Sequence, residues 1–334
     1  MPASMTAHGR PRLRLITTGG TIAMKLDPAL GAPVPALAGA DLLAAVPRLA
    51  QIAEVRVDDL FNVPSVEMGE SRWPALHRAV AAALASADVD GVIVSHGTDT
   101  LEESAWFLDL SLRSDKPVVL VGAQRNASEP DVDGPRNLCA AARVCAAPAA
   151  RGLGVLVVMN DRIHAARDVA KWHTADVAGF HSERGALGSV VAERVLVARR
   201  PARASPLFEL RAQALPRVEI VPAFAGAGGW MVHAAAQQGA RGLVLQALGA
   251  GNVPRAMHDA VVDVLAAGLH VVVATRVPTG EVQPTYGFVG GGQSLHRAGA
   301  IFASDLSAHK ARILLLLALQ DPRSADDLQR LFAA

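Results

Sequence analysis

The sequence predicts an α/β protein with a larger N-terminal domain on a mostly parallel sheet and a smaller flavodoxin-like C-terminal domain. Short apolar runs rich in β-branched residues alternate with segments whose apolar positions recur at helical spacing. Several of these runs end in glycine and small polar residues, as strands of open α/β sheets do at their carboxyl ends. The pattern stops in the charged, proline-rich stretch 199–216 and then restarts. We therefore expect domains over residues 1–198 and 217–334, joined by a linker.

The first 198 residues read as strands that alternate with helices, which is typical of a largely parallel sheet. Residues 24–38 contain Pro28, Pro33 and Pro35. We expect them to form a long loop, of the kind that often acts as a lid. Strands are expected at residues 13–16, 54–57, 91–95, 116–122 and 152–158, and helices at 40–50, 73–85, 101–108 and from 133 onward.

The same alternation resumes after the linker and predicts a second, smaller doubly wound domain. Its expected strands are valine-rich and short, and its expected helices are rich in alanine and leucine. Strands are expected at 218–221, 242–245 and 270–274, and helices at 230–238, 254–267 and 308–319.

Composition narrows the class of protein. The 334 residues are 51% hydrophobic and 19% charged, an ordinary globular balance, and the net charge of +1 gives no reason to expect a nucleic-acid or membrane partner. No apolar run approaches the length of a membrane span, and Met1–Pro11 lacks the apolar core of a secretory signal. Cys139 and Cys145 lie six residues apart on an expected helix and face different directions. Without a disulfide, a reducing, cytoplasmic location is expected.

The most informative stretch is Gly91–Thr100, a buried strand that breaks into a polar turn before a helix. The turn carries hydroxyls, a carboxylate and an imidazole at the edge of the sheet where ligands bind. One interpretation is a functional turn. The other is a capped helix, with Asp99 as the N-cap and Glu102 completing a capping box.

A second polar turn follows the first expected strand, at residues 17–23. Its glycine pair allows a sharp turn and a close approach by a ligand. The turn is not a phosphate-binding loop, because the lysine and the glycine spacing of such loops are absent. Thr18 and Thr21 therefore belong either to a plain tight turn or to a reactive site.

A threonine hydroxyl is a weak nucleophile that requires a base, and a desolvated lysine can serve as one. Lys171 lies in a short polar stretch just after an expected strand and is a candidate, although a solvated surface lysine would fit equally well. No metal site is expected, because His164, His173 and His181 lack the i,i+4 spacing and no cysteine or carboxylate completes a ligand set.

Two signatures, Thr18–Ala23 and His96–Thr100, together resemble those of bacterial-type L-asparaginases. The resemblance covers nearly the whole chain, in the family's order and spacing. It continues through residues 116–125, 133–138, 154–161, 167–171, 276–280 and 286–289.

The resemblance implies hydrolysis of L-asparagine to L-aspartate and ammonia, with no cofactor or metal. Thr21 matches the family's first catalytic threonine, its nucleophile. Thr98 matches the second threonine, and Asp99 and Lys171 match the residues that support it and help to activate water. Which threonine attacks is left open. Asp99 would also bind the substrate's α-ammonium.

The resemblance also implies a substrate-binding set. Ser65 would hold the α-carboxylate, and backbone N–H groups would stabilise the oxyanion. Two further residues would come from a neighbouring subunit, since the family's enzymes are usually homotetramers built as dimers of dimers. The implied set is Ser65, Gly20, Gly97, Ala123, Asn252 and Glu281, the last two from the neighbour.

One departure from the family concerns a catalytic tyrosine that usually follows the first signature. The only tyrosine here is Tyr286, far along the chain. A weak or inactive amino-acid-binding relative therefore stays open as an alternative, as does the ammonia-releasing subunit of a tRNA-dependent amidotransferase. Val66 stands where many dual-activity relatives have a glutamine, which predicts a preference for asparagine over glutamine.

Overall fold

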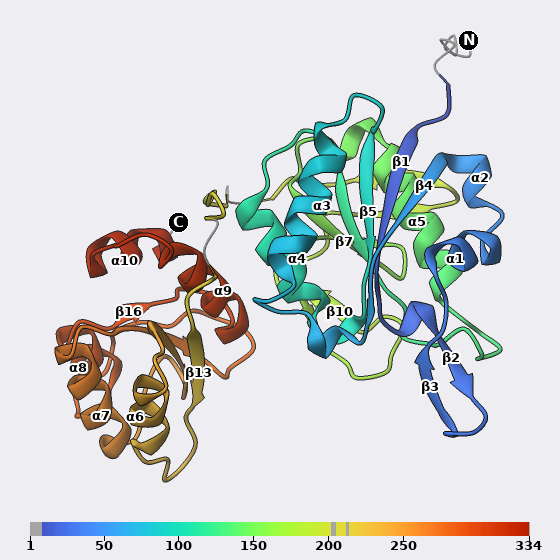
Figure 1. Cartoon of the computed structure of the whole chain (residues 1–334). Coiled ribbons are helices and arrows are strands. Elements are labelled where there is room, and N and C mark those ends of the chain that lie inside the picture. The colour runs from blue at the N-terminus through green and yellow to red at the C-terminus, as the bar shows by residue number, and fades with distance from the viewer. Residues whose placement is uncertain (1–8, 202–204, 212–213, 334) are drawn as a thin grey trace. The chain divides into compact units, whose positions relative to one another are not determined.

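The computed structural model describes residues 9–201, 205–211 and 214–333, and divides the chain into two compact units, Met1–Ala202 and Arg203–Ala334 (Figure 1). The expected linker 199–216 includes residues 202–204 and 212–213, and the N-terminal stretch assessed for a signal includes residues 1–8; these lie outside the described residues. None of the helices in the described ranges is long and apolar enough to cross a membrane.

The first unit is built on an eight-stranded sheet of order β12-β11-β8-β7-β6-β5-β1-β4. Five neighbouring strands are parallel, and β8, β11 and β12 are antiparallel additions at one edge. The strands are β1 (Arg12–Gly19), β4 (Glu54–Val63), β5 (Gly91–Ser95), β6 (Val118–Val121), β7 (Val155–Met159), β8 (Arg162–Ala165), β11 (Gly188–Val191) and β12 (Arg194–Val197).

Helices cover both faces of this sheet, with α3 and α4 on one side and α5 on the other (Figure 1). Side chains of α5 pack with Leu15 of β1 and Ile93 of β5 in one buried cluster, which also contains Val46 and Leu49 from the region of α1 and α2. Every residue of β5, β6 and β7 is buried, so both faces of the central sheet are shielded from water, as the continuous apolar strands require. The helices are α1 (Gly39–Ala45), α2 (Leu49–Ile52), α3 (Trp73–Ala85), α4 (Leu101–Ser111) and α5 (Gly134–Ala146).

The second unit has a four-stranded parallel sheet whose strands follow chain order, β13 to β16. The predicted α/β class, with a larger mostly parallel sheet domain and a smaller domain, is confirmed. The elements are β13 (Val218–Pro222), α6 (Trp230–Gln237), β14 (Gly242–Ala247), α7 (Arg255–Ala266), β15 (His270–Thr275), α8 (Gly292–Arg297), β16 (Ile301–Phe302), α9 (Ala308–Ala318) and α10 (Ala325–Ala333).

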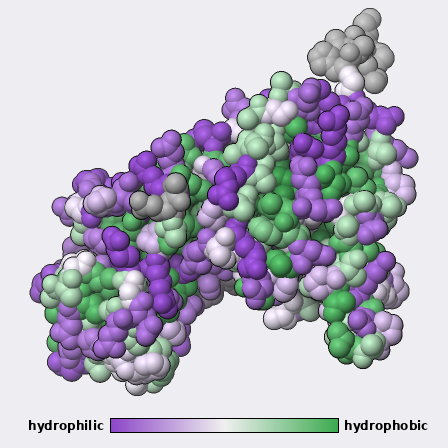
Figure 2. Space-filling model, in the orientation of Figure 1, coloured by the Kyte–Doolittle hydropathy of each residue, from purple (hydrophilic) through white to green (hydrophobic). Residues whose placement is uncertain are grey.

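The structure departs from the expected elements at two places early in the chain. The expected loop 24–38 contains an antiparallel hairpin of β2 (Met24–Asp27) and β3 (Ala32–Pro35). Its prolines are tolerated because a separate two-stranded ribbon has no central strand to interrupt. Leu26 and Leu30 are half or more exposed, and Figure 2 shows apolar residues at this hairpin. The expected helix 40–50 is split into α1 and α2 around Pro47, which lacks the N–H that a continuous helix needs.

Candidate active site

The two threonine-bearing turns lie side by side because β1 and β5 are adjacent parallel strands, with Thr17 opposite Ser95. Gly20 has a φ of +86°, and a Cβ on it would lie 2.2 Å from the Cα of Gly97. The turns therefore touch backbone to backbone, which only glycine permits here. The Thr18 hydroxyl donates to the carbonyl of Ser95 at 2.9 Å and links the two strand ends.

The Thr21 side chain lies in a short 3₁₀ turn, Thr21–Ala23, directly after this contact. The residue is partly exposed, and its hydroxyl forms no hydrogen bond with another described residue. Its neighbours Ile22 and Ala23 are buried in a small cluster with Ala123, which has no exposed surface. Burial of Ile22 and Ala23 thus fixes the turn, while the Thr21 hydroxyl is left without a hydrogen-bond partner among the described residues.

Ser65 reaches the same place from the other neighbour of β1. It follows β4 in the 3₁₀ turn Ser65–Glu67 and is 5% exposed. A Cβ on Gly97 would lie 2.8 Å from the Ser65 Oγ, so the two residues are in close contact. The Thr100 hydroxyl donates to the Ser65 carbonyl at 2.6 Å. The ends of β4, β1 and β5 therefore bring Ser65, Thr21 and Thr98 into one region.

Lys171 approaches Thr98 from β9 (Val169–Lys171), which pairs with β10 (Phe180–Ser182). Its ammonium Nζ donates to the Thr98 Oγ1 at 2.8 Å and to the Asp99 Oδ1 at 2.7 Å. The Lys171 side chain is 15% exposed and that of Asp99 is 62% exposed. The ammonium is therefore held inside, while the carboxylate still faces solvent and can receive a second cation.

The capped-helix interpretation of this turn is wrong. Helix α4 begins at Leu101, and the preceding Thr100 makes no side-chain cap. Asp99 lies in a 3₁₀ turn, Thr98–Thr100, and its carboxylate pairs with Lys171. The Glu102 Oε2 accepts the backbone N–H of Lys171 at 3.2 Å. Both carboxylates that could have capped the helix are directed to Lys171 instead.

Gln124 is a residue that the sequence did not single out. Its Nε2 donates to the Asp176 carbonyl at 3.0 Å, which fixes the orientation of the amide, because a carbonyl can only accept. The Oε1 then faces Thr98, whose hydroxyl donates to it at 3.2 Å. The Thr98 proton thus points to Gln124, and its oxygen accepts from Lys171.

His96 lies beneath the second turn and has no exposed surface. Its Nδ1 is 2.7 Å from the Gly97 carbonyl, and no described residue bonds its Nε2. Burial lowers the pKa of His96 to about 4, more than the bond to the Gly97 carbonyl raises it. The ring is therefore neutral near pH 7 and donates through Nδ1 to the carbonyl that precedes Thr98.

The remaining sequence candidates belong to the second unit. The Asn252 Oδ1 accepts the backbone N–H of Gly292 at 3.3 Å, and Glu281 is exposed. Tyr286 is half exposed, and its ring lies 5.9 Å from that of Phe288. Within the described ranges, no group of three or more His, Cys, Asp or Glu side chains could hold a metal ion.

Known family models match both units of the chain. Residues 12–203 match the family model described as "Asparaginase, N-terminal", and residues 217–332 match "Glutaminase/Asparaginase C-terminal domain". The chain belongs to the asparaginase family.

Relatives of this asparaginase-family chain cover almost all of it. It is 41% identical over 336 residues to a "Probable L-asparaginase" of Deinococcus radiodurans, covering 99% of this chain and 98% of that protein. It is 36% identical over 336 residues to a "Probable L-asparaginase periplasmic" of Haemophilus influenzae, covering 96% and 92%. A crystal structure of a "Probable Cytoplasmic L-asparaginase" from Campylobacter jejuni superposes with a TM-score of 0.89 at 34% identity, covering 97% of this chain and 99% of that one.

Proposed function

We propose that this protein is an amidohydrolase that converts L-asparagine and water to L-aspartate and ammonia. The observation that carries the proposal is the contact of the Lys171 ammonium with both Thr98 and Asp99, beside the turn that holds Thr21. Full-length relatives named as L-asparaginases support the same reaction.

The first chemical step assigns the nucleophile to Thr21. Its Oγ attacks the side-chain amide carbon, the C–N bond breaks, and the nitrogen leaves as ammonia with the hydroxyl proton. Thr21 suits this role because the residue is partly exposed and its hydroxyl forms no hydrogen bond with another described residue. Backbone N–H groups of Gly97 and Ala123 are the candidate donors to the oxyanion. The N–H of Gly20, which the resemblance also implied, donates instead to the Val63 carbonyl at 3.1 Å.

The second step cleaves the resulting ester with water. The water's proton returns to the Thr21 Oγ and its hydroxide adds to the acyl carbon, which releases aspartate. We assign Thr98 and Lys171 to hold this water, because the Thr98 oxygen already accepts from the ammonium and Gln124 fixes the direction of its proton.

Substrate binding is assigned to the charged groups around the turns. Asp99 binds the α-ammonium, because its carboxylate is 62% exposed and pairs with Lys171 through Oδ1. The substrate's ammonium can bind the other oxygen, Oδ2, while Lys171 keeps its bond to Oδ1. Ser65 is assigned to the α-carboxylate, since it lies against Gly97 between the two turns.

We further propose a homotetramer, built as a dimer of dimers, in which Asn252 and Glu281 serve the site of a neighbouring subunit. Sedimentation velocity tests this, and a fully active monomer would contradict it. We also propose a cytoplasmic location. The name of the Campylobacter jejuni relative and two free, buried cysteines support it, the name of the Haemophilus influenzae relative points the other way, and cell fractionation would decide.

The functional proposal is tested by ammonia release from L-asparagine, L-glutamine and their D-isomers. We expect L-asparagine to be the best substrate. Thr21→Ala and Thr98→Ala should each lower kcat by several orders of magnitude without unfolding the protein, whereas Thr174→Ala, at an exposed position, should not. No ammonia from any amide would contradict the proposal, and so would near-normal turnover by either site variant.

A further inference from the structure

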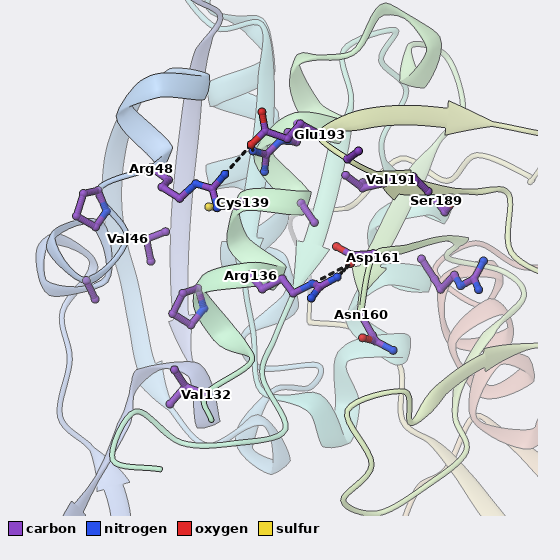
Figure 3. A pocket seen from close by; sticks show the side chains of 18 residues that line it. Val46, Arg48, Val132, Arg136, Cys139, Asn160, Asp161, Ser189, Val191 and Glu193 are labelled. Carbon is purple, nitrogen blue, oxygen red and sulfur yellow. Dashed lines mark hydrogen bonds and ion pairs between the residues drawn. The ribbon is translucent and has the colours of Figure 1, made fainter. Parts of the chain in front are cut away.

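The first unit contains a cavity of about 880 Å³ that shares no residue with the candidate active site. It lies between the end of α1, the first turns of α5 and two hairpin turns, the one between β7 and β8 and the one between β11 and β12 (Figure 3). Its size falls within the range of about 300–1,000 Å³ that is typical of small-molecule sites. The cavity is therefore large enough for a metabolite.

The cavity wall is strongly basic. Four arginines line it and only two carboxylates, which leaves a net formal charge of +2. Arg162 has no ion-pair partner within the described residues, and Arg136 donates through Nε to the Asp161 Oδ2 at 2.8 Å. The four arginines are Arg48, Arg136, Arg143 and Arg162, and the carboxylates are Asp161 and Glu193.

Two of the arginines share a single carboxylate oxygen. The Arg48 Nη2 donates to the Glu193 Oε1 at 2.6 Å, and the Arg143 Nη2 donates to the same oxygen at 2.7 Å. The two guanidinium groups repel each other, and one carboxylate neutralises only half of their charge. Each guanidinium also has further N–H donors than this one bond uses. The pair is therefore suited to a second anion.

The floor of the cavity is apolar and closed to solvent. Val46, Cys139 and Val190 are each below 10% exposed, and the Arg143 side chain is 15% exposed. Charges beside such a floor are screened less than charges in open water. A carboxylate or phosphate that enters here would interact more strongly with Arg143 than it would with an arginine on the open surface.

The backbone conformation of the turn between β11 and β12 does not explain why Glu193 stands in it. Ala192 and Glu193 both have positive φ, 45° and 70°, in a two-residue hairpin turn where asparagine and glycine are preferred. The other turn at the cavity, Asn160–Asp161, also has positive φ but carries the residue types that tolerate it. We therefore attribute the presence of Glu193 in this turn to its hydrogen bonds with Arg48 and Arg143. Figure 3 shows the bond between the labelled Arg48 and Glu193.

We propose that this cavity is a binding site for a small organic anion with carboxylate or phosphate groups, which competes with Glu193 for Arg48 and Arg143. The Glu193 side chain occupies the site as an internal anion when the ligand is absent. Glu193 is 62% exposed, so its side chain can swing into solvent when a stronger anion arrives.

Removing the negative charge of Glu193 and removing the positive charge of Arg48 should change anion binding in opposite directions, which makes the proposal testable. Isothermal titration calorimetry with citrate, and separately with inorganic phosphate, at constant ionic strength would measure binding to the full-length protein. Glu193→Gln removes the internal competitor and should tighten binding several-fold. Arg48→Gln should weaken it about tenfold, the cost of one charge-assisted hydrogen bond. The two probes distinguish a carboxylate site from a phosphate site.

Matched controls carry the same charge changes elsewhere. Glu54→Gln and Arg255→Gln alter exposed residues outside the cavity and should leave binding unchanged. Asparagine turnover without the probes should also be unchanged in all four variants, so this test does not depend on the proposed reaction. Binding of neither probe would overturn the proposal, as would equal affinities across the variants or weaker binding by Glu193→Gln.

Discussion

Acid should destabilise the N-terminal unit through one histidine. His96 has no exposed surface, and burial holds its pKa at about 4, whereas an unfolded histidine titrates near 6.5. Between these values the unfolded chain binds a proton that the folded chain excludes, so the free energy of unfolding falls as the pH falls from 6.5 to 4. With about 1.4 kcal/mol for each pH unit of difference, His96 costs about 2 kcal/mol between pH 7 and pH 5, and about 3 kcal/mol by pH 4.

Urea unfolding followed by tryptophan fluorescence would measure this loss, because Trp73 and Trp106 are buried in the same unit. His96→Asn retains a donor toward the Gly97 carbonyl but cannot titrate. It should be less stable at pH 7 because it leaves a cavity, and it should lose about 2 kcal/mol less than the parent between pH 7 and pH 5. His309→Asn, at an exposed position, is the control. Equal pH dependence in His96→Asn and the parent would refute the reasoning.

Three further substitutions test the site. Gly20→Ala would place a Cβ 2.2 Å from the Gly97 backbone, so thermal unfolding should show a loss above about 2 kcal/mol; an unchanged Tm would contradict the close contact. Gln124→Leu removes the acceptor of the Thr98 hydroxyl and should lower kcat about tenfold with little effect on KM, and a change confined to KM would argue against its role. Val66→Gln should raise kcat/KM for glutamine selectively; comparable values for the two amides in the parent would defeat the expected preference for asparagine.

Much of the parallel sheet could be predicted from the sequence because its strands are buried on both faces. Residues 91–95 form β5 with every residue buried, and their apolar run is bounded by glycine and a polar turn. The same reasoning placed the first threonine turn at the end of β1. The antiparallel strands β8, β11 and β12 were not predicted. They are four residues long, as β6 is, but they lack the continuous, fully buried apolar run that marked β6.

The site was harder to predict because its contacts are long-range. Lys171 reaches Asp99 across 72 positions, and only the family resemblance, not local spacing, distinguished it from a surface lysine. The capping-box prediction was wrong because of the same long-range contact: Lys171 is a stronger partner for the Asp99 carboxylate than the N-terminus of the helix is. Gln124 was missed because its anchor, the Asp176 carbonyl, lies 52 positions away in a loop with no pattern.

The central claim is that Thr21 attacks the amide and that a water held by Thr98 and Lys171 then hydrolyses the Thr21 ester. Trapping the acyl-enzyme tests this claim most directly. Lys171→Met should still be acylated by L-asparagine but should lose most of its hydrolysis step. After acid quench and trypsin digestion, mass spectrometry of this variant should find an aspartyl adduct on the peptide of residues 15–25, at Thr21. An adduct at Thr98, no adduct on any peptide, or near-normal turnover by Lys171→Met would contradict the account.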